Sequence, residues 1–112
     1  MKAVVRVYLY DEAGNRFFGE GPYRLLMGVE RLGSLKKAAD DMGMAYTKAL
    51  TMVKRAEKEL GFALTEKVIG GKSGGGSYLT PQAKEFLQKY EHYRDTCYEA
   101  DAAIYHQIFP EQ

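Results

Sequence analysis

The spacing of apolar residues predicts three short helices in the first two thirds of the chain. Apolar positions recur every three or four residues in three successive segments, and this is the period of one face of a helix. A glycine follows each segment, as expected where a helix ends in the left-handed conformation. The predicted helices cover residues 22–32, 35–42 and 45–60, and the glycines that end them are Gly33, Gly43 and Gly61.

The second and third predicted helices are joined by a turn of about three residues centred on Gly43. Ser34 is a good N-cap for the second helix, whose apolar face carries Ala38 and Ala39. Such small side chains let another helix cross closely at a steep angle. A tight turn between two helices of this kind predicts a helix-turn-helix.

Two further patterns predict β-hairpins on either side of these helices. Residues 2–10 are β-branched and aromatic, and the turn around Gly14 places Phe17 and Phe18 on a returning strand. Residues 62–69 and 77–80 predict a second pair of strands, connected by the sequence GGKSGGG.

The last segment predicts one long helix. Thr80 and Pro81 provide an N-cap followed by proline at the first helical position, and nothing interrupts the helix before Pro110. About 29 residues would span roughly 43 Å, which is more than a small core can cover. The helix either lies along its own domain or pairs with a second copy, and we favour a homodimer. Its predicted seam is Phe86, Tyr90, Tyr93, Cys97, Ala100 and Ile104.

Composition is typical of a soluble globular domain, with 46% hydrophobic and 28% charged residues. No apolar run is long enough to cross a membrane, and the single cysteine, Cys97, is consistent with a reducing cytoplasm. Net charge is only +1, but residues 34–80 carry eight Lys or Arg against five acids, and residues 81–112 carry three against six. This asymmetry favours a polyanion as partner of the middle of the chain.

The glycine-rich connection contains Lys72 and Ser73, which match the end of a nucleotide-binding phosphate loop. However, Glu66 occupies the place of the first glycine of that motif, and no helix follows Ser73. We therefore expect the wing of a winged helix-turn-helix, whose tip contacts a DNA backbone through Lys72 and Ser73. The alternative is a hairpin tip that has no partner.

In a helix-turn-helix, the start of the second helix enters the major groove of DNA. Several candidate contacts have a structural alternative. Ser34 would then cap the helix without contacting DNA, Tyr46 would be half-buried against the second helix, and Lys54 and Arg55 would lie on a solvated helix face. His92 and His106 lack a third metal ligand, and no catalytic set is apparent, so we predict neither a metal site nor an enzyme. The candidate DNA-binding residues are Ser34, Ala45, Tyr46, Thr47, Lys48, Thr51, Lys54, Arg55, Lys72 and Ser73.

The stretches GSLKKAADDMGMAYTKAL and VIGGKSGGGSYLT resemble the N-terminal DNA-binding domain of molybdate-responsive ModE-type transcriptional regulators. That domain is related to the winged helix of LysR-type regulators. The resemblance implies a homodimer that binds DNA upstream of molybdenum-uptake genes, with a recognition helix at 45–60, a wing at 70–77 and a dimer helix at 81–109. Family members continue into an oxyanion-binding domain. These 112 residues contain no candidate molybdate site, so we predict no cofactor and leave the effector open.

The sequence thus predicts an α+β, mostly α fold: a winged helix-turn-helix domain at 1–80, with an N-terminal β-hairpin, and a long dimerisation helix at 81–112. The leading hypothesis is a sequence-specific transcriptional regulator that binds double-stranded DNA as a cytoplasmic homodimer. The alternative is a winged helix that binds another protein and not DNA. The basic surface of residues 45–58 favours the first hypothesis.

Overall fold

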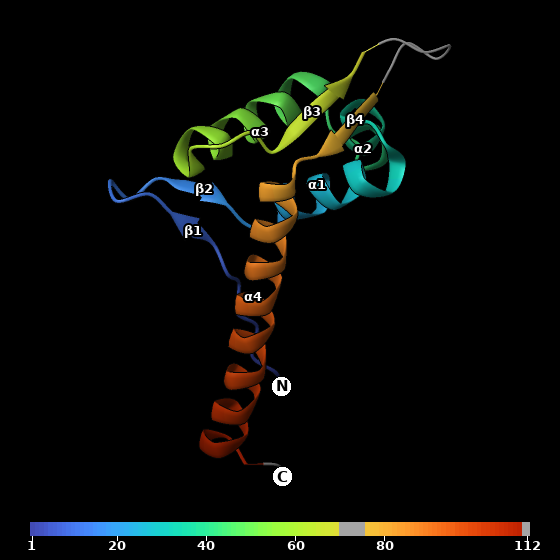
Figure 1. Ribbon diagram of the computed structural model, residues 1–112. Coiled ribbons are helices and arrows are strands. Elements are labelled where there is room, and N and C mark those ends of the chain that lie inside the picture. The colour runs from blue at the N-terminus through green and yellow to red at the C-terminus, as the bar shows by residue number, and fades with distance from the viewer. Residues whose placement is uncertain (70–75, 111–112) are drawn as a thin grey trace.

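The computed structural model describes residues 1–69 and 76–110, so the predicted wing contacts Lys72 and Ser73 lie outside the described residues. Three short helices and two hairpins gather at one end of a long helix (Figure 1). The helices are α1 (Glu20–Leu32), α2 (Leu35–Asp41), α3 (Tyr46–Leu60) and α4 (Pro81–Ile108). The strands are β1 (Leu9–Tyr10), β2 (Arg16–Phe18), β3 (Thr65–Val68) and β4 (Gly76–Leu79), which form two antiparallel pairs.

Local sequence signals set the limits of the short helices. Gly33 and Gly61 are the C-caps of α1 and α3, as predicted. The Ser34 hydroxyl accepts a hydrogen bond of 3.1 Å from the backbone N–H of Lys37, which confirms it as the N-cap of α2. Helix α1 begins at Glu20, two residues before the predicted start. Pro22 permits this, since the N–H groups of the first turn have no helical partner.

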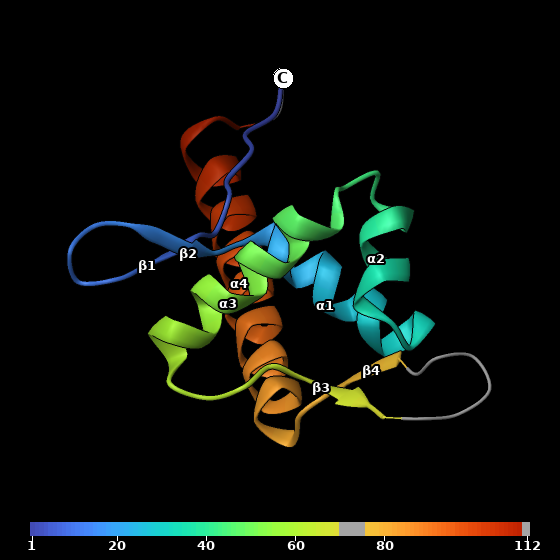
Figure 2. The same cartoon turned by 90° about the horizontal axis from the view of Figure 1, so that it is seen from above.

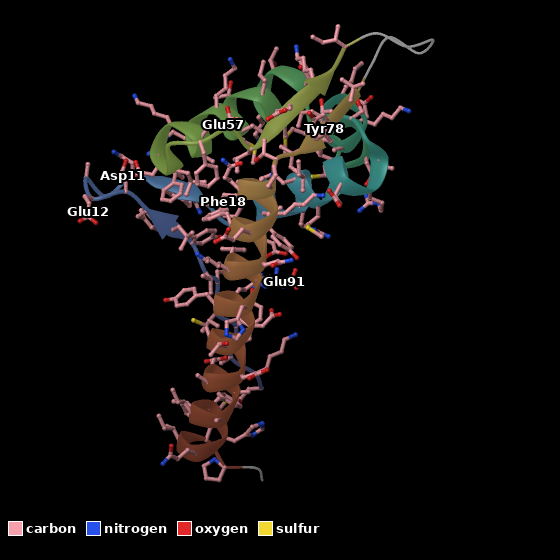
Figure 3. All side chains as sticks on the ribbon, in the orientation of Figure 1. Asp11, Glu12, Phe18, Glu57, Tyr78 and Glu91 are labelled. Atoms are coloured by element: carbon pink, nitrogen blue, oxygen red, sulfur yellow. The ribbon has the colours of Figure 1, made fainter. Side chains whose placement is uncertain are left out.

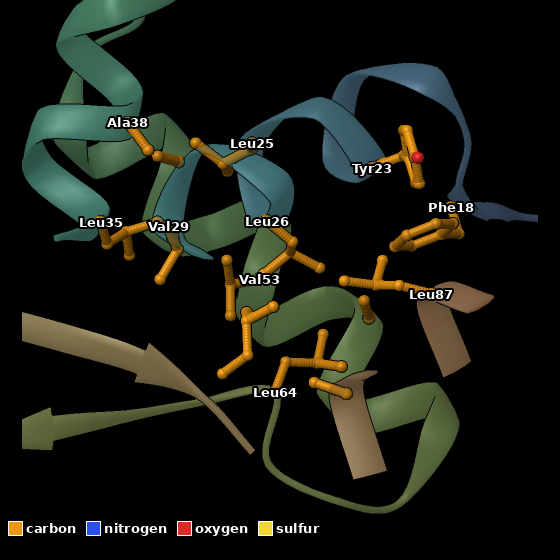
Figure 4. Close-up of a cluster of buried hydrophobic side chains, with 14 of the residues drawn as sticks. Phe18, Tyr23, Leu25, Leu26, Val29, Leu35, Ala38, Val53, Leu64 and Leu87 are labelled. Carbon is orange, nitrogen blue, oxygen red and sulfur yellow. The ribbon is translucent and has the colours of Figure 1, made fainter. Parts of the chain in front are cut away.

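The core lies where α1, α2 and α3 meet the start of α4 (Figure 4). Leu25, Leu26 and Val29 of α1 are completely or almost completely buried. A Cβ atom on Gly28 would lie 3.0 Å from the Cβ of Ala38, so α1 and α2 cross where both side chains are small or absent. The small residues of α2 therefore allow a close crossing with α1.

Thr80 joins the second hairpin to α4 and is 2% exposed. Its hydroxyl donates a hydrogen bond of 2.6 Å to the carbonyl of Ala63 and accepts one of 3.0 Å from the backbone N–H of Ala83. The predicted N-cap of α4 is confirmed. One side chain thereby fixes both the end of β4 and the direction of the long helix.

The first three turns of α4 pack on the domain instead of facing outward. Ala83, Leu87 and Tyr90 are buried, and Phe18 makes edge-to-face contacts with Phe86 at 4.9 Å and with Tyr90 at 5.0 Å between ring centroids. Tyr90 is only 3% exposed, so its place in the predicted dimer seam is wrong. The helix uses positions 83, 87 and 90 to close its own core.

Polar contacts hold the next turn of α4 against α1. The hydroxyl of Tyr23 donates a hydrogen bond to the carboxylate of Glu91. The guanidinium of Arg94 lies 4.7 Å from the centroid of the Tyr23 ring and forms an ion pair of 3.3 Å with Glu20. The C-terminal part of α4 extends away from the helical domain (Figure 1).

The prediction of a strand over residues 2–10 is wrong for most of its length. Only Leu9 and Tyr10 pair with β2, because β2 has three residues and provides no longer edge. Residues 1–8, here called the N-terminal arm, run along α4 instead. The hydroxyl of Tyr90 donates to the carbonyl of Val7 at 2.9 Å, and that of Tyr105 donates to the carbonyl of Met1 at 3.0 Å. The alternating pattern thus reflects packing against a helix.

Candidate nucleic-acid interface

The turn between α2 and α3 is built around Gly43, whose φ of 65° lies in the left-handed region that glycine adopts without strain. The backbone N–H of Met44 donates to the carbonyl of Ala39 at 2.9 Å and closes the turn. Helix α3 begins directly afterwards, with Ala45 in an extended conformation as N-cap and no side-chain hydrogen bond to the cap. The predicted geometry around Gly43 is confirmed.

Helix α3 has one buried and one exposed face. The predicted apolar stripe is Ala49, Val53, Ala56 and Leu60; the first three are buried and Leu60 is half-buried. The exposed face carries short polar and basic side chains near the start of the helix. The hydroxyl of Thr51 donates a hydrogen bond of 2.9 Å to the carbonyl of Thr47, so this hydroxyl is oriented by the helix itself. The exposed residues of this face are Thr47, Lys48, Thr51 and Lys54.

Arg55 does not project with this exposed set, although we predicted it as a DNA contact. Its guanidinium lies 2.8 Å from the carboxylate of Asp11, and the two side chains are 34% and 15% exposed. The backbone N–H of Asn15 lowers the pKa of Asp11, and the guanidinium of Arg55 lowers it further. The ion pair therefore attaches the tip of the first hairpin to α3. The charge of Arg55 is paired with that of Asp11.

The second hairpin is docked on the joint between α1 and α2. The backbone N–H of Ser77 donates to the carbonyl of Gly33 at 2.9 Å. A Cβ atom on Gly76 would lie 2.3 Å from that same carbonyl oxygen, so only glycine permits this approach. Seen from above, α3 lies between the first hairpin and the second (Figure 2).

A shallow groove of about 230 Å³ lies where the second hairpin meets the starts of α2 and α3. Tyr46 is half-buried in it, and Ser34 forms part of its wall while serving as the cap. Lys36 and Lys67 also line this groove. Sequence reasoning had not selected these two lysines, because the positions of α2 and β3 relative to α3 depend on tertiary packing.

Two acidic side chains near this surface, Glu57 and Glu66, accept hydrogen bonds within the fold; Glu57 and Tyr78 are labelled in Figure 3. The carboxylate of Glu57 accepts a hydrogen bond of 2.7 Å from the backbone N–H of Leu64. The carboxylate of Glu66 accepts one of 2.8 Å from the hydroxyl of Tyr78, and this bond raises the pKa of Tyr78. Two of the acids that offset the basic charge in the sequence are thus engaged in holding the fold.

The described residues contain no cluster of three side chains suited to bind a metal ion. A cavity of about 490 Å³ lies between the first hairpin and α3, beside Lys48 and Met52. Within the same part of the chain, no helix has the length and apolar character needed to span a bilayer. The exposed start of α3 and the groove beside it carry basic side chains, which suit contact with a polyanion.

No protein-family model matches the chain. Among curated proteins, it is 40% identical over 79 residues to the molybdenum transport protein ModE of Herbaspirillum seropedicae. The resemblance to ModE regulators is confirmed. The chain is also 31% identical over 67 residues to the DNA-binding transcriptional dual regulator ModE of Escherichia coli K12, and 33% identical over 66 residues to the molybdenum-pterin-binding protein MopB of Rhodobacter capsulatus.

These matches cover only part of each protein. They include 70% of this chain for the Herbaspirillum ModE and 60% for the E. coli ModE. The chain spans only 28% and 26%, respectively, of the length of these two relatives. The similarity therefore concerns about a quarter of a ModE protein.

The fold is similar to that of the BenM DNA-binding domain, solved in a complex with the benA site 1 DNA. The TM-score is 0.58 at 21% sequence identity, and the match covers 81% of this chain and 97% of the BenM chain. The predicted winged helix with a long C-terminal helix is confirmed.

Proposed function

We propose that this protein is a sequence-specific DNA-binding transcriptional regulator that acts as a homodimer. One observation carries the proposal: Thr47, Lys48 and Thr51 are exposed together at the start of α3, next to the groove at the second hairpin. Resemblance to ModE regulators supports control of molybdenum-related genes in the cytoplasm. We propose no catalytic role.

In this proposal α3 enters the major groove, and its first two turns contact base edges. In this conformation the Thr51 hydroxyl donates its proton to the Thr47 carbonyl, and its oxygen is left to accept a hydrogen bond from DNA. It would therefore accept from the amino group of adenine or cytosine, and its methyl group could contact thymine. Lys48 would donate to guanine or to a phosphate.

Backbone phosphates would be held on both sides of these base contacts. Lys54 lies farther along the exposed face of α3, and Ala45 brings the uncapped N-terminus of the helix to the surface. Tyr46 and Ser34 line the groove that Lys36 and Lys67 make basic. The contacts proposed for Lys72 and Ser73 would extend the same surface along the wing.

The part of α4 from Tyr93 onward, here called its second half, would provide the dimer interface. Tyr93 and Ile104 are 57% and 53% exposed, and Cys97 and Ala100 lie between them on the same helix. Exposed apolar side chains at helical spacing favour a two-stranded contact. A two-fold axis there would present two α3 helices to half-sites about 34 Å apart, or a multiple of that distance.

Binding to duplex DNA at several salt concentrations tests the proposal. Fluorescence anisotropy with a random duplex should show binding at about 50 mM salt that weakens as salt is raised, because phosphate contacts release counterions. Lys48→Ala should make the slope of log K against log salt shallower by about 0.9. Lys89→Ala is the matched control, since Lys89 is exposed on α4 and pairs with Glu85.

Two outcomes would contradict the proposal. If no duplex binds at low salt, the function fails and the alternative of a protein-binding winged helix takes its place. If Lys48→Ala and Lys89→Ala reduce the slope equally, α3 is not the recognition helix. If the protein does bind DNA through α3, selection of bound sequences from a random DNA pool would identify the operator.

A further inference from the structure

A groove of about 480 Å³ runs between the N-terminal arm and the second half of α4. The arm contributes Val5 and Val7, and α4 contributes Cys97, Ala100 and Ile104. Its lining is mostly apolar, and the arm covers only one edge of the α4 stripe. The apolar surfaces of the arm and of the helix are thus continuous.

Large apolar side chains remain exposed around this groove. Val4 of the arm is 60% exposed, and Ile104 and Ile108 of α4 are 53% and 63% exposed. Contiguous apolar surface of this kind usually marks an interaction site in a soluble protein. A single copy of the described chain does not cover it.

The charges around the groove are of opposite sign on its two sides. The arm carries Lys2 and Arg6. On this part of α4, Glu91 accepts from Tyr23 and Asp95 pairs with Arg94, so the acid that lines the groove is Asp101. Arg6 and Asp101 both line the groove, and neither makes an ion pair or a side-chain hydrogen bond in the part of the chain that the structure describes. A two-fold axis would bring the basic arm of one copy opposite the acidic helix of another.

We propose that the N-terminal arm and the second half of α4 form one composite face, which binds the same face of a second copy. This inference rests on the homodimer of the proposed function and adds the arm as half of its interface. The contact is isologous, so each arm faces the partner's α4. The charge complementarity and the continuity with the α4 stripe both point to a second copy as the occupant.

Sedimentation equilibrium of three variants tests the composite face, with circular dichroism as a measure of folding. Val5→Glu places a carboxylate in the groove. The groove is open in a single chain, so the carboxylate can reach water there, but the partner would bury it. We expect the dimer dissociation constant to rise by at least about tenfold. Arg6→Glu should also weaken the dimer. Arg24→Glu, the same charge reversal on the exposed face of α1, should leave it unchanged.

The outcomes separate this inference from the proposed function. If Val5→Glu and Arg6→Glu form dimers as tightly as the wild type, the arm is not part of the interface and the inference is overturned, while DNA binding through an α4 dimer stands. If Val5→Glu loses its helical signal, the result for Arg6→Glu alone decides. If Arg24→Glu weakens the dimer as much as Arg6→Glu, the interface is elsewhere. A monomeric wild type would contradict the homodimer itself.

Discussion

Replacing Thr80 by valine tests the joint between the second hairpin and the long helix. Valine has nearly the shape of threonine but carries no hydroxyl. Thr80 is almost fully buried, and its hydroxyl both accepts from the N–H of Ala83 and donates to the carbonyl of Ala63. The substitution therefore removes two hydrogen bonds without creating a cavity.

The expected cost follows from these two bonds. Loss of an N-cap typically costs about 1 kcal/mol, and the buried position of Ala83 places the cost near the upper end, at about 2 kcal/mol. The bond to Ala63 contributes about 1 kcal/mol more, the typical net value of one hydrogen bond. We expect Thr80→Val to lower the free energy of unfolding by about 2–3 kcal/mol.

Thr80→Ser is the matched control, because serine keeps the hydroxyl and loses only one methyl group. We expect it to cost at most about 1 kcal/mol. Urea denaturation followed by circular dichroism, at one fixed protein concentration, measures both variants. The reasoning is refuted if Thr80→Val lies within about 0.5 kcal/mol of the wild type, or if serine is as damaging as valine.

Three further substitutions probe other contacts. Gly76→Ala forces the second hairpin away from the carbonyl of Gly33, so unfolding should become easier by about 1–3 kcal/mol and DNA affinity should fall; an unchanged melting temperature would contradict this. Asp11→Asn releases Arg55 and should steepen the salt dependence of DNA binding by about one unit, whereas an unchanged slope would show that Arg55 cannot reach DNA. Burial raises the pKa of Tyr90 from 10.0 to about 12. The unfolded chain therefore loses this proton at a lower pH than the folded chain, and the free energy of unfolding should fall between about pH 10 and pH 12. Tyr90→Phe should reduce that fall in urea titrations, and an equal fall would assign it to other groups.

Much of the helical domain could be predicted because its signals are local. Gly43 requires no tertiary partner to favour a turn, and Ser34 caps α2 through a bond to a residue three positions away. The buried face of α3 follows from its apolar spacing. The same local pattern predicts that Thr47, Lys48 and Thr51 are exposed, and they are.

The remaining features depend on contacts between distant segments. The pairing of Arg55 with Asp11 joins residues 44 positions apart, and nothing in either neighbourhood indicates it. Tyr90 fits a heptad seam as well as it fits a core, and only the position of Phe18 decides between them. Likewise, the alternation in the N-terminal arm is the same for a strand in a sheet and for a segment that packs on a helix.

The first eleven residues have a mechanical consequence for the whole molecule. They are anchored at three points: Met1 to the distal end of α4, Val7 to its middle, and Asp11 to α3. An extended chain of this length reaches at most about 33–40 Å, so it can follow only limited movement of its anchors. If the distal part of α4 tilts, this segment must either pull on α3 or release one anchor. We expect a tilt of the distal part of α4 to reach α3 through the ion pair of Asp11 with Arg55.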